Sequence, residues 1–458
     1  VSGSAHDSNI HLARQVEKHG CLSFVCDMPR FARGRRGGRV GRMLLQTCLL
    51  LLLLAAMLAP MANVATAMFP SNAAIMRVVR DGPLFAQLER CGAAPADASE
   101  WRARAEALAT SVAPSVVAGN ACDDAEALAA LFADVTEVEA VDASVGLDAE
   151  PSPLALARQR LFQVCLPTYF WCRHVHAEAK RQGRIGGEEQ RRVFVVGMSA
   201  PQGCGKTTMV EQLVALWTAD GVKCAALSID DVYLNGTALD ALAAANPSNR
   251  LLGVRGNPGT HDIGLALSTF AALDDALAEG SAAAPPILLP RYDKALRGGR
   301  GDRAPRSQWP TAPVGLEVLL FEGWMAGFSP TSPERAREVG GDDLAAINAN
   351  LAARYGDSCG GYSAMFGRAD AWLVVGVEDP AHVFKWRREA EQKMALAGRG
   401  AMDDAAVEDF VSRYMPAYRL YIPGLYEQAR GAGVDGKPTL FVHVDGDRRP
   451  VPDPESPR

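Results

Sequence analysis

The stretch Val193-Phe-Val-Val-Gly-Met-Ser-Ala-Pro-Gln-Gly-Cys-Gly-Lys-Thr-Thr208 decides the fold of this chain. It begins with an apolar run, residues 193–196, typical of a parallel strand covered on both faces. It ends in Gly205-Lys206-Thr207, the pattern of a loop that wraps phosphate groups ahead of a helix. The pattern starts with Ala200, where glycine is usual. A chance strand, turn and helix is the alternative, but the presence of all three parts favours phosphate binding.

Phosphate binding explains the residue types found in this loop. Glycines let backbone N–H groups turn toward phosphate oxygens, and the N-terminus of the following helix favours anions. Lys206 is placed to reach the β- and γ-phosphates, and the Thr207 hydroxyl to ligate Mg²⁺. The predicted nucleotide-binding residues are Ala200, Gly203, Cys204, Gly205, Lys206, Thr207 and Thr208.

Cys204 raises a separate hypothesis. A thiol at a helix N-terminus tends to have a lowered pKa, so oxidation of Cys204 would block nucleotide binding. The alternative is that a small residue merely fits the loop.

Length, charge and cysteine content limit the kinds of protein that this chain can be. A chain of 458 residues, 48% of them hydrophobic, can form one large domain with additions or two domains. The formal net charge of −6, without a long basic block in the C-terminal half, argues against a nucleic-acid partner. Ten cysteines without metal-site spacing indicate reduced thiols in an intracellular compartment.

The chain divides into regions of different composition. Residues 1–67 are expected to be a targeting region, because the basic run before Met43 and the apolar segment 43–67 have the layout of a signal peptide. A membrane span is the alternative, but Pro60 ends the apolar run early. Residues 68–190 are predicted to be a helical, partly disordered extension, and residues 191–458 the phosphate-loop domain.

Further apolar runs alternate with helical or irregular segments. They predict strands at residues 223–230, 287–291, 317–322, 371–377 and 439–445. This alternation indicates an α/β fold with a doubly wound parallel sheet, in which ligands bind beyond the carboxyl ends of the strands. Acidic residues fall at several of these ends: Asp230, Asp231, Asp293 and Glu322.

Two of these acids are candidates for chemistry. Glu322, in Phe321-Glu-Gly-Trp324, could hold Mg²⁺ or its water. Asp230 could orient or deprotonate an acceptor hydroxyl. Capping of a helix is the alternative role for both. The guanine-reading pattern Asn-Lys-x-Asp is absent from the sequence, which weakens a GTPase interpretation.

Polar loops supply candidate substrate contacts. The predicted substrate-binding residues are Asp231, Tyr233, Arg255, His261, Asp262, Arg291, Tyr292, Arg300 and Arg303. The arginines among them could hold a small carboxylate or phosphate, although surface ion pairs are the alternative. Arg387 and Arg388, on a predicted helix, could close over the phosphates as a lid, and a solvated helix face is the alternative.

Together, these motifs resemble those of the plant-type D-glycerate 3-kinases, a branch of the P-loop kinases that include uridine kinase, phosphoribulokinase and pantothenate kinase. The matching segments are Ser199-Ala-Pro-Gln-Gly-Cys-Gly-Lys-Thr-Thr208, Ser228-Ile-Asp-Asp-Val-Tyr-Leu234, Arg255-Gly-Asn-Pro-Gly-Thr-His-Asp262, Pro290-Arg-Tyr-Asp-Lys294, Gly299-Arg-Gly-Asp-Arg-Ala304, Phe321-Glu-Gly-Trp-Met325 and Phe410-Val-Ser-Arg-Tyr-Met-Pro-Ala-Tyr418. In that family the loop also begins with Ala. Val232 and Ala295 depart from its usual Phe and Ser.

The resemblance implies phosphorylation of D-glycerate to 3-phosphoglycerate with ATP and Mg²⁺, as a step of photorespiration in plastids. It aligns Asp230 with the residue that acts as base in uridine-kinase-like relatives. From the motifs and the resemblance together we expect Lys206, Asp230, Glu322, Arg387 and Arg388 to act in catalysis, and Thr207 with Glu322 to hold the metal. A kinase of the same architecture for a nucleoside, pantothenate or a sugar phosphate is the alternative, as is a regulatory nucleotide-binding protein without turnover. After leader removal no membrane anchor is expected. A cytoplasmic or secretory location is the alternative to the plastid.

Overall fold

The computed structural model describes residues 72–117, 159–186, 191–279, 286–353, 360–396 and 401–455. All of them belong to a single unit, Ala67–Arg458. The predicted targeting region 1–67 lies outside the described residues, as do residues 118–158 of the predicted extension 68–190. Within the described part, no helix is both long and apolar enough to cross a membrane.

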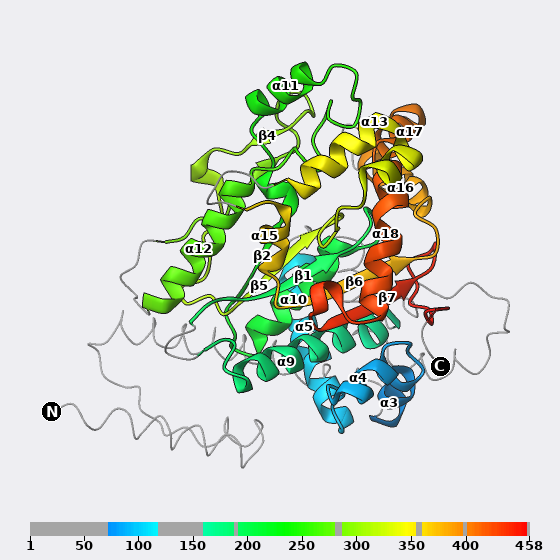
Figure 1. Ribbon diagram of the computed structural model, residues 1–458. Helices are drawn as coiled ribbons and strands as arrows, with labels where there is room; N and C mark the ends of the chain where they lie inside the picture. Colours follow the sequence, from blue (N-terminus) through cyan, green and yellow to red (C-terminus); the bar gives the residue numbers. More distant parts are fainter. Residues whose placement is uncertain are drawn as a thin grey trace, which may run out of the picture. The chain divides into compact units, whose positions relative to one another are not determined.

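A parallel sheet of five strands forms the centre of this unit (Figure 1). Its order is β2 (Cys224–Ser228), β5 (Val318–Gly323), β1 (Phe194–Ser199), β6 (Ala371–Val377) and β7 (Thr439–Val444). Every residue of β1 and β6 is buried, as expected for strands with helices on both faces. The predicted α/β fold with a parallel sheet is thus confirmed.

The strand predicted at residues 287–291 is wrong. Leu288 forms only an isolated antiparallel bridge with Thr311. The next residues form β3 (Tyr292–Asp293), which pairs antiparallel with β4 (Asp302–Arg303) outside the main sheet. Pro290 explains the difference, because proline has no N–H to donate to a sheet.

Helices connect and flank the strands. They are α10 (Lys206–Ala219), α11 (Gly236–Ala245), α12 (Ile263–Glu279), α13 (Pro333–Ala352), α15 (Tyr362–Gly367), α16 (His382–Leu396), α17 (Asp404–Ser412) and α18 (Met415–Arg430). Short 3-10 turns occur at η2 (Ile229–Val232), η3 (Arg306–Gln308) and η4 (Val434–Gly436). Helix α13 is interrupted at Gly340–Gly341, where the backbone is not helical.

The N-terminal helices form a further layer beside α10 (Figure 1). They are α3 (Asn72–Arg80), α4 (Phe85–Cys91), α5 (Ala98–Val117), the π-helical turn η1 (Leu161–Cys165) and α9 (Leu166–Arg181). Aromatic side chains join this layer to the core: Phe170 is buried against Trp101, and Tyr169 against Trp217 of α10. Pro167 lies just after the π-helical turn η1, within a continuous helical run.

Candidate active site

The strand register brings the predicted phosphate loop, Asp230 and Glu322 to one edge of the sheet. Strand β5 lies between β1 and β2, and Glu322 pairs with Met198 on one side and Ser228 on the other. The phosphate loop follows β1, and Asp230 lies in η2 directly after β2. Glu322 is therefore flanked by both, as expected for carboxyl ends of neighbouring parallel strands.

The phosphate loop has the conformation that its glycines predict. Gly203 and Gly205 have φ angles of 84° and 95°, and Gly205 precedes the first turn of α10. A side chain at Gly203 would also collide with Cβ of Trp386, only 2.7 Å away. The loop thus presents its N–H groups at a helix N-terminus, the arrangement that binds phosphate.

Lys206 and Glu322 form an ion pair beside this loop. Nζ of Lys206 lies 3.3 Å from Oε2 of Glu322, and both side chains are largely buried. Burial alone would lower the pKa of Lys206, but Glu322 raises it above its ordinary value. The lysine is therefore a cation, as contact with phosphates requires.

Cys204 does not have the lowered pKa expected at a helix N-terminus. Burial raises the pKa of its thiol, and the opposing effect of Lys206 is smaller. The side chain is therefore a thiol rather than a reactive thiolate. This removes the physical basis for the oxidation hypothesis.

Asp230 is held as a carboxylate by two donors. Nζ of Lys294 lies 2.6 Å from Oδ2, and the Tyr233 hydroxyl donates to Oδ1 at 2.7 Å. Burial alone would raise the pKa of Asp230, but Lys294 and Tyr233 hold it well below its usual range. Lys294 was not among the predicted site residues, and its only sequence signal is its position in the segment 290–294.

Asp231 has a different environment from its neighbour. Its Oδ1 atom accepts the backbone N–H of Tyr292 at 3.1 Å, while Nη1 of Arg291 is 3.8 Å from Oδ2. Burial raises the pKa of Asp231. The residue fixes the β3 segment to the end of β2, which favours a positioning role.

His261 is buried, and Tyr362 holds its ring. The Tyr362 hydroxyl accepts the backbone N–H of Gly259 at 2.8 Å and forms a hydrogen bond of 2.8 Å with Nδ1 of His261. Burial lowers the pKa of His261 to about 4, so the ring is neutral. Its Nε2 atom has no hydrogen-bond partner among the described residues.

This histidine stands next to the predicted acceptor site. Its ring packs 4.7 Å from that of Tyr233, the residue that donates to Asp230. Tyr362 lies 101 positions from His261 in sequence, and no sequence signal identified it.

The predicted substrate arginines all have protein partners. Arg255 donates to the carbonyls of Gly299 and Arg300, and Arg300 pairs with Asp240. Arg303 pairs with Asp262 at 2.8 Å and donates to the Tyr233 carbonyl. Arg291 makes the weakest contact, 3.8 Å from Asp231, and is exposed. These residues surround Tyr292, whose ring lies under Arg255. Binding of a substrate carboxylate by any of these arginines stays a prediction.

Arg387 and Arg388 lie on α16 as predicted, but they contact acids of α16 and α17. Arg387 pairs with Glu391 at 2.5 Å and lies over the ring of Phe410. Arg388 reaches Glu408 at 3.4 Å. Closure over the phosphates would require both pairs to break, so the lid role stays a prediction.

A different arginine contacts the phosphate loop. Arg448, in the turn after β7, donates from Nε to the Gly203 carbonyl at 2.7 Å. It pairs with Glu389 at 2.7 Å and stacks over the ring of Trp386. Its φ of 63° is unusual for a residue with a side chain. No sequence motif indicates this contact, which joins residues 245 positions apart.

Similarity to known proteins agrees with this arrangement. The chain is 39% identical over 294 residues to the chloroplastic D-glycerate 3-kinase of Arabidopsis thaliana. This match covers 64% of the present chain and 61% of the Arabidopsis enzyme. It is 32% identical over 240 residues to the uncharacterized kinase mug58 of Schizosaccharomyces pombe, covering 50% of this chain and 82% of the yeast protein. No known family model matches the sequence.

A solved structure shows the same fold. D-glycerate 3-kinase from Cryptococcus neoformans var. grubii superposes with a TM-score of 0.52 at 27% sequence identity, and the match covers 63% of this chain and 97% of that one. These similarities agree with the phosphate loop found at the end of β1. The chain therefore belongs to the family of P-loop kinases that includes the D-glycerate 3-kinases and mug58.

Proposed function

We propose that this protein is a D-glycerate 3-kinase that transfers the γ-phosphate of ATP to the C3 hydroxyl of D-glycerate. The observation that carries the proposal is the carboxylate of Asp230, which lies beside the phosphate loop with Lys294 and Tyr233 as donors. An acceptor hydroxyl needs such an acid next to the γ-phosphate. The relative that is 39% identical supplies the identity of the acceptor.

The residues of the site suit distinct roles in the transfer. Lys206 and the loop amides hold the ATP phosphates, and Asp230 orients the glycerate hydroxyl for in-line attack. Lys294 neutralises negative charge next to Asp230 as the anionic substrates approach. The Nε2 atom of His261 is placed to contact a glycerate hydroxyl, because a buried polar atom without a partner among the described residues favours a polar ligand.

The residues at the end of β5 fit the Mg²⁺ that kinases of this family require. Oε2 of Glu322 is buried and has no described partner except the ion pair with Lys206. Mg²⁺ usually binds through one or two carboxylates together with substrate phosphates and waters. Glu322 and the Thr207 hydroxyl would hold the ion, which neutralises phosphate charge when bound.

Two alternatives to a D-glycerate kinase can be tested together. One is a regulatory nucleotide-binding protein without turnover, and the other is a kinase that phosphorylates a different metabolite. ADP release should be measured with ATP and Mg²⁺ alone, and then with D-glycerate, L-glycerate, uridine, pantothenate and ribulose 5-phosphate. We expect strong stimulation by D-glycerate only. Stimulation by another acceptor, or none by any, would reject the proposal.

The cellular role follows from the same proposal. A plastid enzyme acting in photorespiration is supported by the chloroplastic relative. The signal-like leader would then direct the protein through the secretory system into a plastid bounded by several membranes. The native protein should then begin within a few residues of Met68, which N-terminal sequencing would test. An intact hydrophobic segment 43–67 in the native protein would reject leader removal.

A further inference from the structure

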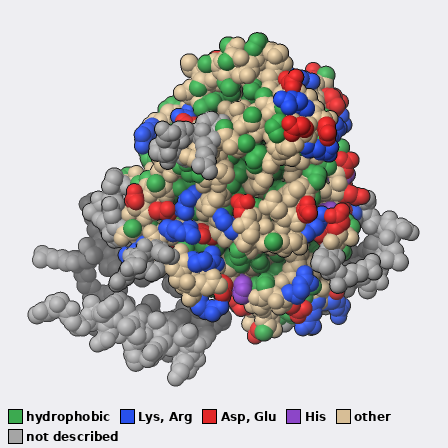
Figure 2. Space-filling model, viewed as in Figure 1, with side chains coloured by type: hydrophobic (Ala, Val, Ile, Leu, Met, Phe, Trp, Pro, Cys, Tyr) green, Lys and Arg blue, Asp and Glu red, His purple; other side chains and the backbone are tan. Residues whose placement is uncertain are grey.

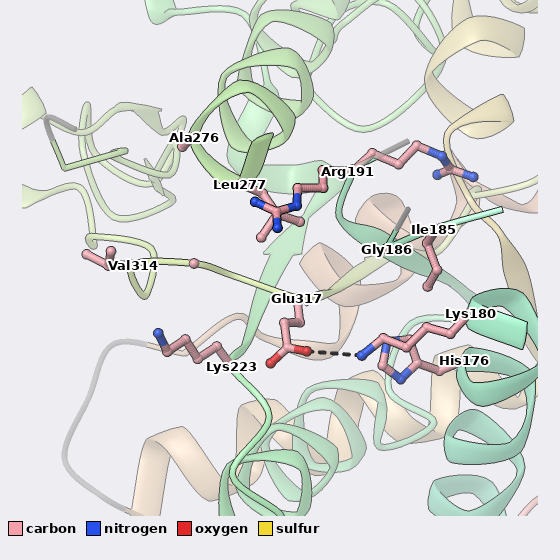
Figure 3. A pocket seen from close by; sticks show the side chains of 12 residues that line it. His176, Lys180, Ile185, Gly186, Arg191, Lys223, Ala276, Leu277, Val314 and Glu317 are labelled. Carbon is pink, nitrogen blue, oxygen red and sulfur yellow. Dashed lines mark hydrogen bonds and ion pairs between the residues drawn. The ribbon is translucent and has the colours of Figure 1, made fainter. Parts of the chain in front are cut away.

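A cavity of about 510 Å³ lies at the end of the sheet opposite the phosphate loop, but its charged side chains do not converge. Lys180 pairs with Glu317 at 3.2 Å, while Lys223 points away toward Val314 (Figure 3). On the face of the molecule that Figure 2 shows, basic and acidic side chains are intermixed. Neither feature indicates a ligand. The segment 410–418, a sequence motif without a role in the proposed transfer, carries more information.

This segment leads from α17 into α18 and contains two buried tyrosines. Tyr414 and Tyr418 lie one helical turn apart, joined by the backbone bond from Tyr418 N–H to the Tyr414 carbonyl, so their side chains share one face. Both rings pack edge-on against Trp324, with ring centroids 5.2 Å and 5.1 Å away. Trp324 comes two positions after Glu322, at the end of β5. These three side chains, called the aromatic bridge, therefore lie at the catalytic edge of the sheet.

The aromatic bridge holds the phosphate loop at Gln202. The Tyr418 hydroxyl accepts the backbone N–H of Gln202 at 3.0 Å, and the Tyr414 hydroxyl interacts with the Gln202 side chain. Gln202 directly precedes Gly203, where the left-handed part of the loop begins. The bond to Tyr418 therefore fixes the backbone just ahead of the amides that face the phosphates.

The aromatic bridge also holds residues 255–262, called the acceptor loop because three of the predicted substrate-binding residues belong to it. Nε1 of Trp324 donates to the Gly256 carbonyl at 3.2 Å, and the Tyr414 hydroxyl donates to the Arg255 carbonyl at 3.3 Å. The ring of Tyr414 fills the space of a side chain at position 256, since an added Cβ would lie 2.5 Å from its Cε1 atom. Two loops from distant parts of the sequence thus rest on the same rings.

Both hydroxyls keep their protons near neutral pH. Burial raises the pKa of Tyr414 to about 12, and the negative charge of Asp230 acts in the same direction. Burial also raises the pKa of Tyr418 well above its ordinary value. Tyr414 is therefore a hydrogen-bond donor to the acceptor loop, and its hydroxyl lies within electrostatic range of the catalytic acid.

We propose that Tyr414 and Tyr418 are positioning residues that hold the acceptor loop and the phosphate loop in a fixed relation, so that the acceptor hydroxyl meets the γ-phosphate in line. Phosphoryl transfer depends largely on such positioning, because the protein does little covalent chemistry in it. The inference rests on the proposed kinase function, but its nucleotide part is independent of the acceptor's identity. Since the two hydroxyls serve different loops, their removal should affect different substrates.

Tyr418→Phe keeps the ring but leaves the Gln202 N–H without its acceptor. We expect the Kd for ATP with Mg²⁺, measured by calorimetry without any acceptor, to rise about fivefold or more. The KM for D-glycerate should change by less than about twofold. Tyr414→Phe leaves that N–H paired but frees the Arg255 carbonyl, so it should raise the KM for D-glycerate about fivefold or more and the Kd for ATP much less.

Tyr426→Phe is the matched control on the same helix. The Tyr426 hydroxyl accepts the backbone N–H of Val377 at 3.0 Å, and Val377 ends β6 and belongs to neither loop. This variant should lose about as much thermal stability as Tyr418→Phe, with normal constants for both substrates. An equal rise of the ATP Kd in Tyr426→Phe and Tyr418→Phe, or normal constants in both bridge variants, would overturn the proposal.

The two levels of the account fail in different ways. If the wild type binds ATP but does not phosphorylate D-glycerate, the proposed function is wrong. The ATP Kd of Tyr418→Phe then still decides whether this hydroxyl positions the phosphate loop: a rise of about fivefold or more supports the role, and an unchanged value rejects it.

Discussion

Asp230 is the residue on which the proposed chemistry depends most. Replacing it with Asn keeps the shape of the side chain but removes the charge and the ability to take a proton. We expect Asp230→Asn to lower kcat by about 10²–10⁴-fold, the range of a positioned acid or base, with little change in ATP affinity. Steady-state kinetics with D-glycerate, together with nucleotide binding, would measure both.

Lys206→Ala is the informative comparison, because this lysine contacts phosphates rather than the acceptor. It should weaken ATP binding itself. If Asp230→Asn turned over D-glycerate almost normally, the acceptor role would belong elsewhere, with Asp231 the first candidate.

Tyr362 holds the imidazole of His261 through its hydroxyl, 2.8 Å from Nδ1. Tyr362→Phe removes this hydrogen bond but keeps the aromatic ring beside His261, so the burial that lowers the pKa of His261 to about 4 is kept. We expect kcat/KM for D-glycerate to fall by about twofold to tenfold, the value of one hydrogen bond, with a pH profile parallel to that of the wild type. Steady-state kinetics across the pH range would measure both.

A matched control is Tyr421→Phe, which removes another buried hydroxyl, one that donates to Asn348 on α13. Its kcat/KM for D-glycerate should match that of the wild type. A normal kcat/KM for Tyr362→Phe would show that this hydroxyl does not position His261 for the substrate.

At the scale of elements, the turn after β7 supports the phosphate loop. The contact from Arg448 to Gly203 is charge-assisted, a kind worth about 1.5–3 kcal/mol. Arg448→Ala should therefore raise the KM for ATP about tenfold or more, while kcat changes less. Steady-state kinetics with varied ATP would measure this.

Arg448→Gly separates the side chain from the backbone. Glycine adopts the observed φ of 63° without strain, so this variant should unfold at a higher temperature than Arg448→Ala. Its KM for ATP should nevertheless match that of Arg448→Ala. A normal KM in both variants would exclude a role for the turn in nucleotide binding.

The elements also show where sequence reasoning succeeds. The phosphate loop, Asp230 and Glu322 could be located because each depends on a short motif at the end of a strand, and parallel strands place such ends together. The prediction of a strand at 287–291 was wrong because it relied on the apolar residues of this segment and gave too little weight to Pro290, which cannot donate to a sheet. Tyr362 and Arg448 could not be found, since their contacts join segments that only the folded chain brings together.

At the scale of the whole molecule, buried histidines make stability depend on pH. Burial lowers the pKa of His176 to about 4, below its ordinary value of 6.5. Between these values the unfolded chain binds a proton that the folded chain does not. The free energy of unfolding must therefore fall as pH decreases through 6.5, by about 2 kcal/mol for one such histidine between about pH 7 and pH 5.

Denaturant unfolding at both pH values would measure this contribution. His176→Gln removes the titrating group, so its loss of stability on acidification should be smaller than that of the wild type by about this amount. An equal loss in both proteins would show that His176 is not buried in its neutral form.

The central claim is transfer of phosphate to the C3 hydroxyl of D-glycerate, and identification of the product by ³¹P NMR tests it most directly. Purified protein should be incubated with ATP, Mg²⁺ and D-glycerate, and the new phosphate ester compared with authentic 2- and 3-phosphoglycerate. We predict 3-phosphoglycerate from the wild type and almost none from Asp230→Asn. Formation of 2-phosphoglycerate, or of no phosphoglycerate by folded protein that binds ATP, would contradict the account.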